Sequence, residues 1–175
     1  FEKGNTIYEE AIKSKQKVDD QLRLTQEKLH LSKPFASQRI NASNQEILVY
    51  INYEYTKSSE IERITCDLID DYNKKIEALP SNLLERNTAE NELALKYIAE
   101  LFQNLEWLHP FFDGQGRTDL VLLAKLLSEN GFNPSILYNP YFSTFEPLDE
   151  WITYLKKGME LWKEESNPNV SLYRS

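Results

Sequence analysis

The sequence predicts an all-α domain with one small β-hairpin. Apolar residues recur at helical spacing along most of the 175-residue chain, and prolines, glycines and small polar residues separate the helical segments. One short run, residues 45–53, instead has a high density of β-branched and aromatic residues, which is typical of a strand. At this length we expect a single domain over residues 1–175, with its core over residues 33–165.

The N-terminal half of the chain predicts a helix, the hairpin and a second helix. Residues 5–30 have a thin apolar stripe among many charges, so we expect a peripheral helix with a solvated face. A hairpin over residues 33–53 should follow and lie over the loop at 109–117. The second helix is amphipathic, its start is marked by Ser59 and Glu62 in the spacing of a capping box, and it should end before residue 80.

The C-terminal half predicts the remaining helices of a set of six or so. One begins at Asn87 or Thr88 and leads directly to residue 109. Residues 120–127 are apolar nearly all round, which predicts a helix buried at the centre of the domain. It should end at Asn130 and Gly131, a favourable helix C-terminus.

Composition excludes several classes of function. The formal net charge of −8 and the low pI argue against binding nucleic acid or an anionic membrane, because both need a basic face. The single cysteine, Cys66, excludes an internal disulfide and a Cys-rich zinc site, and its place in an apolar helical stripe predicts a core thiol. No apolar run is long enough to insert into a membrane, so we expect a cytoplasmic protein. The start at Phe1 rather than Met is compatible with a piece of a longer protein.

The stretch from His109 to Arg117 gathers a base, a carboxylate, a glycine-rich turn and a cation within nine residues. Pro110 has no amide proton and disfavours the helical conformation in the residue before it, so the preceding helix should end near His109. Gly114 and Gly116 then allow a close turn into the next helix. The N-terminus of that helix would expose free N–H groups and the positive end of its dipole, which together form an anion site.

These residue types suit transfer chemistry at a phosphate. An imidazole can accept a proton near neutral pH, so His109 can act as a general base. Asp113 can bind Mg²⁺, which takes one or two carboxylates together with phosphate oxygens. The predicted phosphate-binding residues are Gly114, Gln115, Gly116, Arg117 and Thr118, and Arg117 can pair with a phosphate through two hydrogen bonds.

The stretch resembles the signature of the Fic (Fido) domain family, HxFx(D/E)GNGRxxR. Six positions match this signature in type, order and spacing: His109, Phe111, Asp113, Gly114, Gly116 and Arg117. Two positions depart from it, because Gln115 replaces the Asn and Leu120 replaces the second Arg.

The resemblance implies a Fic-like helical fold whose hairpin, residues 33–53, acts as a flap that docks a target protein by strand addition. It implies transfer of a nucleotidyl group, AMP from ATP, to a hydroxyl side chain of that target. The implied catalytic residues are His109, Asp113 and Arg117, with Mg²⁺ on Asp113 and ATP as donor, while Phe111 would anchor the loop in the core. The location implied is the bacterial cytosol, or a host cytosol for a secreted effector.

The two departures leave alternatives open. A relative with another donor (another nucleotide, or a phosphocholine or phosphate donor) is one, and a degenerate Fic-fold binding module is another. A helix–helix connector with a surface salt bridge is the structural alternative. Fic proteins are often inhibited by a helix with the pattern (S/T)xxxE(G/N). The Glu-Asn pairs at Glu90 and Glu129 do not fit, because Arg86 and Lys125 precede them by four residues.

Overall fold

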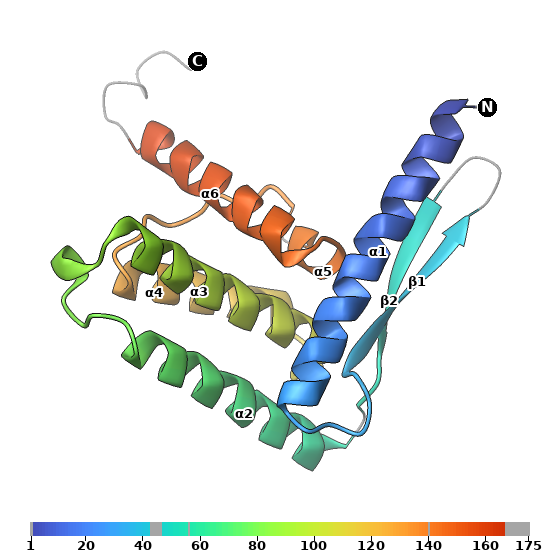
Figure 1. Cartoon of the computed structure of the whole chain (residues 1–175), viewed down its shortest axis with the longest axis horizontal. Coiled ribbons are helices and arrows are strands. Elements are labelled where there is room, and N and C mark those ends of the chain that lie inside the picture. Colours follow the sequence, from blue (N-terminus) through green and yellow to red (C-terminus); the bar gives the residue numbers. More distant parts are fainter. Residues whose placement is uncertain (1, 43–46, 56, 140, 167–175) are drawn as a thin grey trace.

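The structure is a computed structural model that describes residues 2–42, 47–55, 57–139 and 141–166. It is mainly helical, with one two-stranded antiparallel sheet among the described residues, as the sequence predicts (Figure 1). In chain order the elements are α1 (Glu2–Lys28), β1 (Ala36–Ala42), β2 (Ile47–Tyr53), α2 (Ser58–Glu77), the 3₁₀ turn η1 (Leu83–Glu85), α3 (Thr88–Leu108), α4 (Gln115–Glu129), α5 (Phe142–Phe145) and α6 (Leu148–Glu165).

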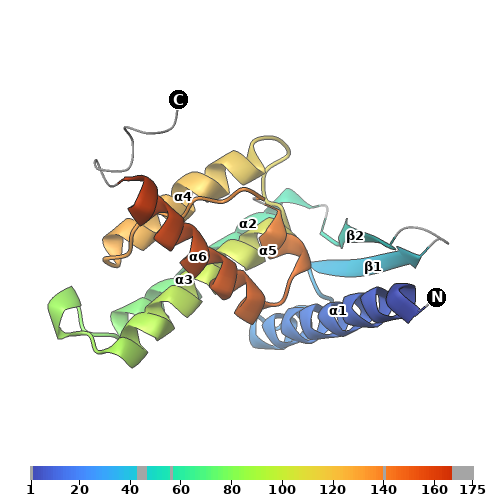
Figure 2. The same cartoon turned by 90° about the horizontal axis from the view of Figure 1, so that it is seen from above.

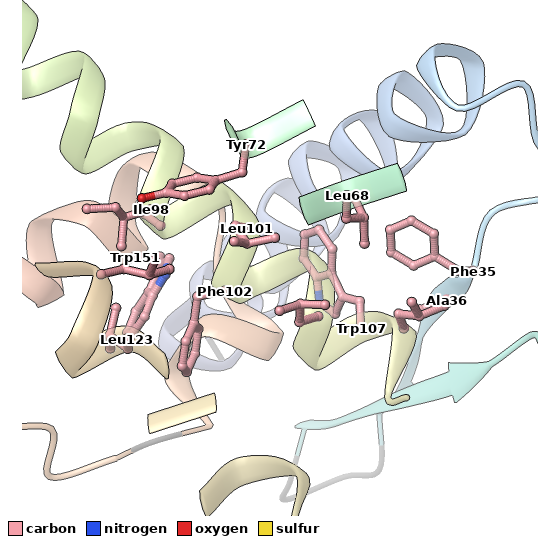
Figure 3. Close-up of a cluster of buried hydrophobic side chains, with 14 of the residues drawn as sticks. Phe35, Ala36, Leu68, Tyr72, Ile98, Leu101, Phe102, Trp107, Leu123 and Trp151 are labelled. Carbon is pink, nitrogen blue, oxygen red and sulfur yellow. The ribbon is translucent and has the colours of Figure 1, made fainter. Parts of the chain in front are cut away.

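Helix α3 is the centre of the domain. Helices α2, α4, α5 and α6 and strand β2 all pack against it, and every residue from Leu101 to Leu108 is buried. The ring of Phe102 stacks on that of Trp151 from α6, with centroids 5.2 Å apart, and Trp107 lies at the other end of the core, where Phe35 and Ala36 lie (Figure 3). The buried side chain of Gln103 on α3 is satisfied, because it donates to the carbonyls of Ser143 and Glu146.

Residues 120–127 lie in a helix, as predicted, but the prediction that this helix is buried at the centre is wrong. Helix α4 packs against α3 with one side only, formed by Leu123, Leu126 and Leu127, whereas the side chain of Val121 is 72% exposed. The apolar residues on the outer side of α4 are therefore surface residues. The number of apolar residues around a helix does not reveal how many neighbours the helix has. Helix α4 lies behind α3 in Figure 1 and at the edge of the domain in Figure 2.

The hairpin is held between α1 and the short helix α5. Strand β1 pairs with β2 from Ala36 opposite Tyr53 to Ala42 opposite Ile47, within the predicted 33–53 range. Helix α1 runs alongside β1, as Figures 1 and 2 show. The buried side chain of Gln38 donates to the carbonyls of Thr144 and Phe145, which joins the hairpin to α5. The segment after α4 thus contains a helical turn, α5, that organises this region.

The predicted helix ends are correct except for one. Asn87 caps α3 in a capping box with Glu90, at 3.0 and 2.8 Å. Helix α4 ends at Asn130 with Gly131 at φ 79°, a left-handed conformation in which glycine is unstrained. The capping box predicted at Ser59 is absent, because the helix already begins at Ser58, and its N-cap residue, Lys57, makes no side-chain cap hydrogen bond.

Cys66 is exposed, so the prediction of a core thiol is also wrong. The buried residues of α2 are Ile64, Leu68 and Tyr72, which are spaced four residues apart. A residue two positions from both Ile64 and Leu68 points to the opposite side of a helix. Across the described part of the chain, no helix is sufficiently long and apolar to cross a membrane.

Candidate active site

His109 is placed by the end of α3. It adopts a left-handed conformation, with φ 51° and ψ 59°, and its N–H donates to the carbonyl of Leu105 at 2.9 Å. Histidine is one of the non-glycine residues found most often in this region of φ/ψ space. The turn directs the imidazole towards β2, where the ring of Tyr53 lies 4.6 Å away between centroids. The Nδ1 atom is buried and has no hydrogen-bond partner among the described residues.

The N-terminus of α4 forms the second part of the site. Gly114 has φ 80°, and its carbonyl accepts the first hydrogen bond of the helix from the Thr118 N–H at 2.9 Å. The N–H groups of the helix residues before Thr118 have no acceptor within the helix, so they are available to bind an anion. A side chain on Gly116 would meet no atom within 4 Å. There is therefore open space beside this first turn.

Asp113 and Arg117 lie together at the edge of the site. Their side chains are 90% and 80% exposed, with Oδ1 of Asp113 3.6 Å from the nearer guanidinium nitrogen. The same Oδ1 accepts a hydrogen bond from the Gly114 N–H at 2.7 Å. Both side chains can move towards a ligand at little cost, because exposed ion pairs contribute little to stability.

A cavity of about 570 Å³ brings these residues together. This volume is within the usual range for small-molecule sites. The motif loop and the start of α4, the strand β2, and the segment around α5 form its walls. The lining residues include His109, Asp113, Gly114, Gln115, Gly116, Arg117 and Leu120 from the motif region, and Tyr50, Tyr53, Glu106, Tyr141 and Thr144 from elsewhere.

Phosphate binding by the backbone amide of Gln115 stays a prediction, and the structure gives the Gln115 side chain a separate role. Its side chain is buried and turns inward, where Oε1 accepts from the Phe111 N–H at 3.0 Å and Nε2 donates to Leu105 and Asp119 at 3.4 and 2.5 Å. The side-chain amide thus holds the motif loop against the end of α3. Only the backbone N–H of Gln115 remains to contact a phosphate.

The expectation that Phe111 anchors the loop in the core is wrong. Its side chain is 47% exposed, and that of Phe112 is fully exposed. Gln115 supplies the anchor instead, through the Phe111 N–H. Thr118 is exposed and does not line the cavity, while Leu120 is half-buried and does. Of the predicted site residues, all except Thr118 therefore meet at one cavity.

Two acidic residues next to His109 were missed by sequence reasoning. Glu106, on α3, and Asp119, on α4, have 6% and 1% of their surface exposed, and each influences the pKa of the other. The sequence feature that could have revealed them is the position of each acidic residue within an otherwise apolar helical stripe. Tyr53 was also missed, because nothing in the sequence indicates which hairpin residue meets the motif.

Burial and mutual repulsion shift the titration of this pair. Burial, with the nearby Asp119 charge, raises the pKa of Glu106 to about 8. Burial also raises the pKa of Asp119, while hydrogen bonds from Gln115 and Glu106 and the charge of His109 oppose that shift. The shared proton therefore belongs on Glu106. Burial likewise raises the pKa of Tyr53, with a contribution from Glu106, so Tyr53 is neutral.

The residues present fit a magnesium ion only in combination with a phosphate ligand. Within the described ranges, no three His, Cys, Asp or Glu side chains are grouped closely enough to hold a metal. Asp113 offers one exposed carboxylate on the cavity wall. Mg²⁺ commonly takes one or two carboxylates and completes its shell with water and phosphate oxygens, so one carboxylate is compatible with such a site.

Comparison with known proteins agrees with this geometry. The model of the Fic/DOC family matches residues 34–127, more than half of the chain, so the protein belongs to the Fic/DOC family. The matched segment runs from the hairpin to α4 and includes the cavity residues of the motif.

Two further comparisons are less informative. A ribonucleoside-diphosphate reductase small chain from Ostreid herpesvirus 1 (isolate France) is 30% identical over 82 residues. These residues are 47% of this chain, and the chain spans only 13% of the length of that relative. No solved structure matches the chain.

Proposed function

We propose that the protein is a Fic-type transferase that moves a nucleotidyl group, AMP from ATP, to a hydroxyl side chain of a target protein. The observation that supports this most is the position of His109. It lines the same cavity as the N-terminus of α4 and Arg117. A base and an anion site thus face the same space, which is the arrangement that attack of a hydroxyl on a phosphate requires.

Each residue has a distinct part in this reaction. His109 accepts the proton of the attacking hydroxyl, a contribution of roughly 10²–10⁴-fold for a general base. The free N–H groups at the start of α4 and the guanidinium of Arg117 meet the negative charge that spreads over the phosphate oxygens. The open space at Gly116 allows the phosphates to approach the backbone closely. Asp113 would hold the magnesium ion, which supplies further positive charge to the phosphates when bound.

We propose that the target docks on the hairpin. Strand β2 pairs only with β1 among the described residues, and four of its side chains, including Tyr50 and Tyr53, line the cavity. An extended segment added to the free edge of β2 would present its side chains beside His109. Strand addition of this kind provides affinity through backbone hydrogen bonds and specificity through alternate side chains.

The test is intact-mass analysis of the purified protein after incubation with Mg²⁺ and, separately, ATP, GTP, CTP, UTP and CDP-choline. Self-modification or modification of an added candidate target should increase the mass by one nucleoside monophosphate, with ATP as the best donor. A gain from CDP-choline equal to phosphocholine would replace the AMP proposal by the alternative donor.

A second candidate function is a binding module without transferase activity. The observation that favours it is Leu120, which places an aliphatic side chain on the cavity wall where the family signature has a second Arg. The absence of a mass increase with every donor, together with a thermal shift on adding nucleotide, would support this alternative. The same panel with His109→Asn separates enzymatic transfer from chemical background, since that variant lacks the base.

A further inference from the structure

The short helix α5 and the residue before it form one wall of the candidate active site. Tyr141, Thr144 and Phe145 line the same cavity as His109 and the N-terminus of α4. A helix of four residues is not stable by itself, because it forms too few hydrogen bonds to offset the ordering of its backbone. The position of this wall therefore depends on what the rest of the protein supplies to α5.

Buried side chains supply hydrogen bonds to the backbone of α5. Four successive carbonyl groups at its C-terminal end have no donor within the helix, as is usual at a helix C-terminus. Gln103 donates to the carbonyls of Ser143 and Glu146 at 2.7 and 2.8 Å. The indole N–H of Trp107 donates to the carbonyl of Thr144 at 2.9 Å. Both donors are on α3 and are 1% exposed, so water does not compete for these bonds.

The third donor, Gln38, comes from the hairpin. It is on β1, is 5% exposed, and its Nε2 donates to the carbonyls of Thr144 and Phe145 at 3.3 and 3.2 Å. These are the two residues of α5 that line the cavity. Gln38 does not line this cavity itself, so it acts on a ligand there only through α5. The hairpin is thereby joined directly to a wall of the site.

We propose that Gln38 is a positioning residue for the nucleotide donor, because it holds the α5 wall in the place that donor binding requires. This inference rests on the proposed transferase function. A ligand in a cavity of this size contacts most of its walls, so a displaced wall weakens binding. Without Gln38, two buried carbonyls lose a donor, which favours other positions of α5. If α5 keeps the competent position a tenth of the time, the apparent affinity falls by about tenfold.

Other contacts also hold α5, so the loss of Gln38 should loosen this segment without unfolding the domain. The ring of Phe142 stacks on that of Tyr154 from α6, with centroids 4.4 Å apart, and the two donors on α3 remain. A purely structural role of Gln38 predicts a lower melting temperature with unchanged donor affinity. Stability alone therefore does not distinguish the two roles, and donor affinity does.

Matched variants separate this contact from a general loss of stability. Gln38→Met removes the donor and keeps an unbranched side chain of similar length. Gln26→Met is the control, because Gln26 on α1 is half-buried and its Nε2 donates to the Leu31 carbonyl, also at 3.3 Å. That bond is outside α5, and Gln26 does not line the cavity. Trp107→Phe removes the α3 donor to the Thr144 carbonyl and likewise leaves the cavity lining intact.

The first measurement is amide hydrogen exchange of residues 141–147 in the free protein, followed by mass spectrometry. Gln38→Met should exchange severalfold faster there, because local opening of α5 becomes easier. Gln26→Met should exchange there at the rate of wild type. Wild-type protection of this segment in Gln38→Met would overturn the inference, because α5 would then keep its place without the contact.

The second measurement is the affinity for ATP in the presence of Mg²⁺, by calorimetry. Binding should be about tenfold weaker in Gln38→Met and unchanged in Gln26→Met. Gln38 and Trp107 share the Thr144 carbonyl, so the double variant should lose more than the two single losses of binding free energy combined. In the transfer assay the KM for ATP should rise while kcat is nearly kept, because Gln38 holds a binding wall and no reacting group.

The outcomes distinguish this inference from the proposed function. A loosened α5 with unchanged ATP affinity would overturn the inference, as would equal losses of affinity in Gln38→Met and Gln26→Met. A wild-type protein that binds no nucleotide would count against the proposed function instead, and the exchange rates then decide the positioning role. If Gln38→Met does not fold, Trp107→Phe applies both measurements to the same carbonyl, and wild-type values in that protein would overturn the inference.

Discussion

The ring of Tyr53, the last residue of β2, lies 4.6 Å from the imidazole of His109 and is tilted by 33° to it. This contact joins the hairpin to the motif loop. We expect Tyr53→Phe to keep the activity and the melting temperature, because the ring makes the contact. Tyr53→Ala should destabilise the protein by about 0.5–1.5 kcal/mol beyond the loss of burial and should slow transfer. Chemical denaturation measures the stability, and the mass assay measures the transfer. Equal behaviour of Tyr53→Phe and Tyr53→Ala would contradict the prediction.

His109→Asn should abolish transfer and leave the fold intact. Asparagine tolerates the left-handed conformation that position 109 adopts, so the turn should survive while the base is lost. Nucleotide affinity, measured by calorimetry, should be nearly unchanged, because the N–H groups of α4 and Arg117 bind the phosphates. Retention of most of the transfer rate would mean that His109 only forms the turn.

Leu120→Arg should tighten binding of ATP more than that of ADP. The side chain lines the cavity and is half-buried, so a guanidinium there can reach a terminal phosphate. A charge-assisted hydrogen bond contributes about 1.5–3 kcal/mol, which corresponds to roughly ten- to hundredfold in affinity. Val121→Arg is the matched control, because Val121 is exposed and lies outside the cavity lining. A large loss of melting temperature that nucleotide does not restore would instead make Leu120 a core residue.

The pKa of Glu106 predicts a dependence of stability on pH. Glutamate in an unfolded chain titrates near pH 4.3, whereas Glu106 in the folded protein has a pKa of about 8. Between these values the folded state holds a proton that the unfolded state has lost, so its contribution to stability decreases as the pH rises and levels off above about pH 8. Glu106→Gln lacks this dependence.

The difference in melting temperature between Glu106→Gln and wild type should therefore increase from pH 4.5 to pH 8 and then stay constant. Carboxylates other than Glu106 and its partner Asp119, such as Asp71 with its lowered pKa, affect both proteins equally and cancel in the difference. A difference that does not vary with pH would show that Glu106 is ionised throughout.

Asn87→Ala should cost about 1 kcal/mol of stability, because the Asn87 side chain caps α3 in the capping box. Ser59→Ala is the matched control. The structure gives Ser59 no cap, so its replacement should change the free energy of unfolding by less than about 0.5 kcal/mol. Urea denaturation measures the free energy of unfolding of both variants. Similar losses of stability in the two would mean that Ser59 caps α2 in solution.

The sequence alone was sufficient to predict most local features of this protein. Pro110 and the glycines that follow it predict the end of one helix and the start of the next, because they act on the backbone of their own neighbours. The same holds for Asn87 at α3 and for Asn130 and Gly131 at the end of α4. The motif from His109 to Arg117 is likewise local, so its order and spacing were enough to indicate the family.

Other features depend on contacts between distant segments, and only the tertiary structure decided them. The central helix is α3 rather than α4, because more elements pack around α3 than a pattern of apolar residues can reveal. Cys66 and Phe111 are exposed because no neighbour covers their sides of the chain. The inward turn of Gln115 and the pairing of Glu106 with Asp119 join residues on two helices, and burial then shifts their protonation. Such shifts arise from desolvation, which is a property of the folded state alone.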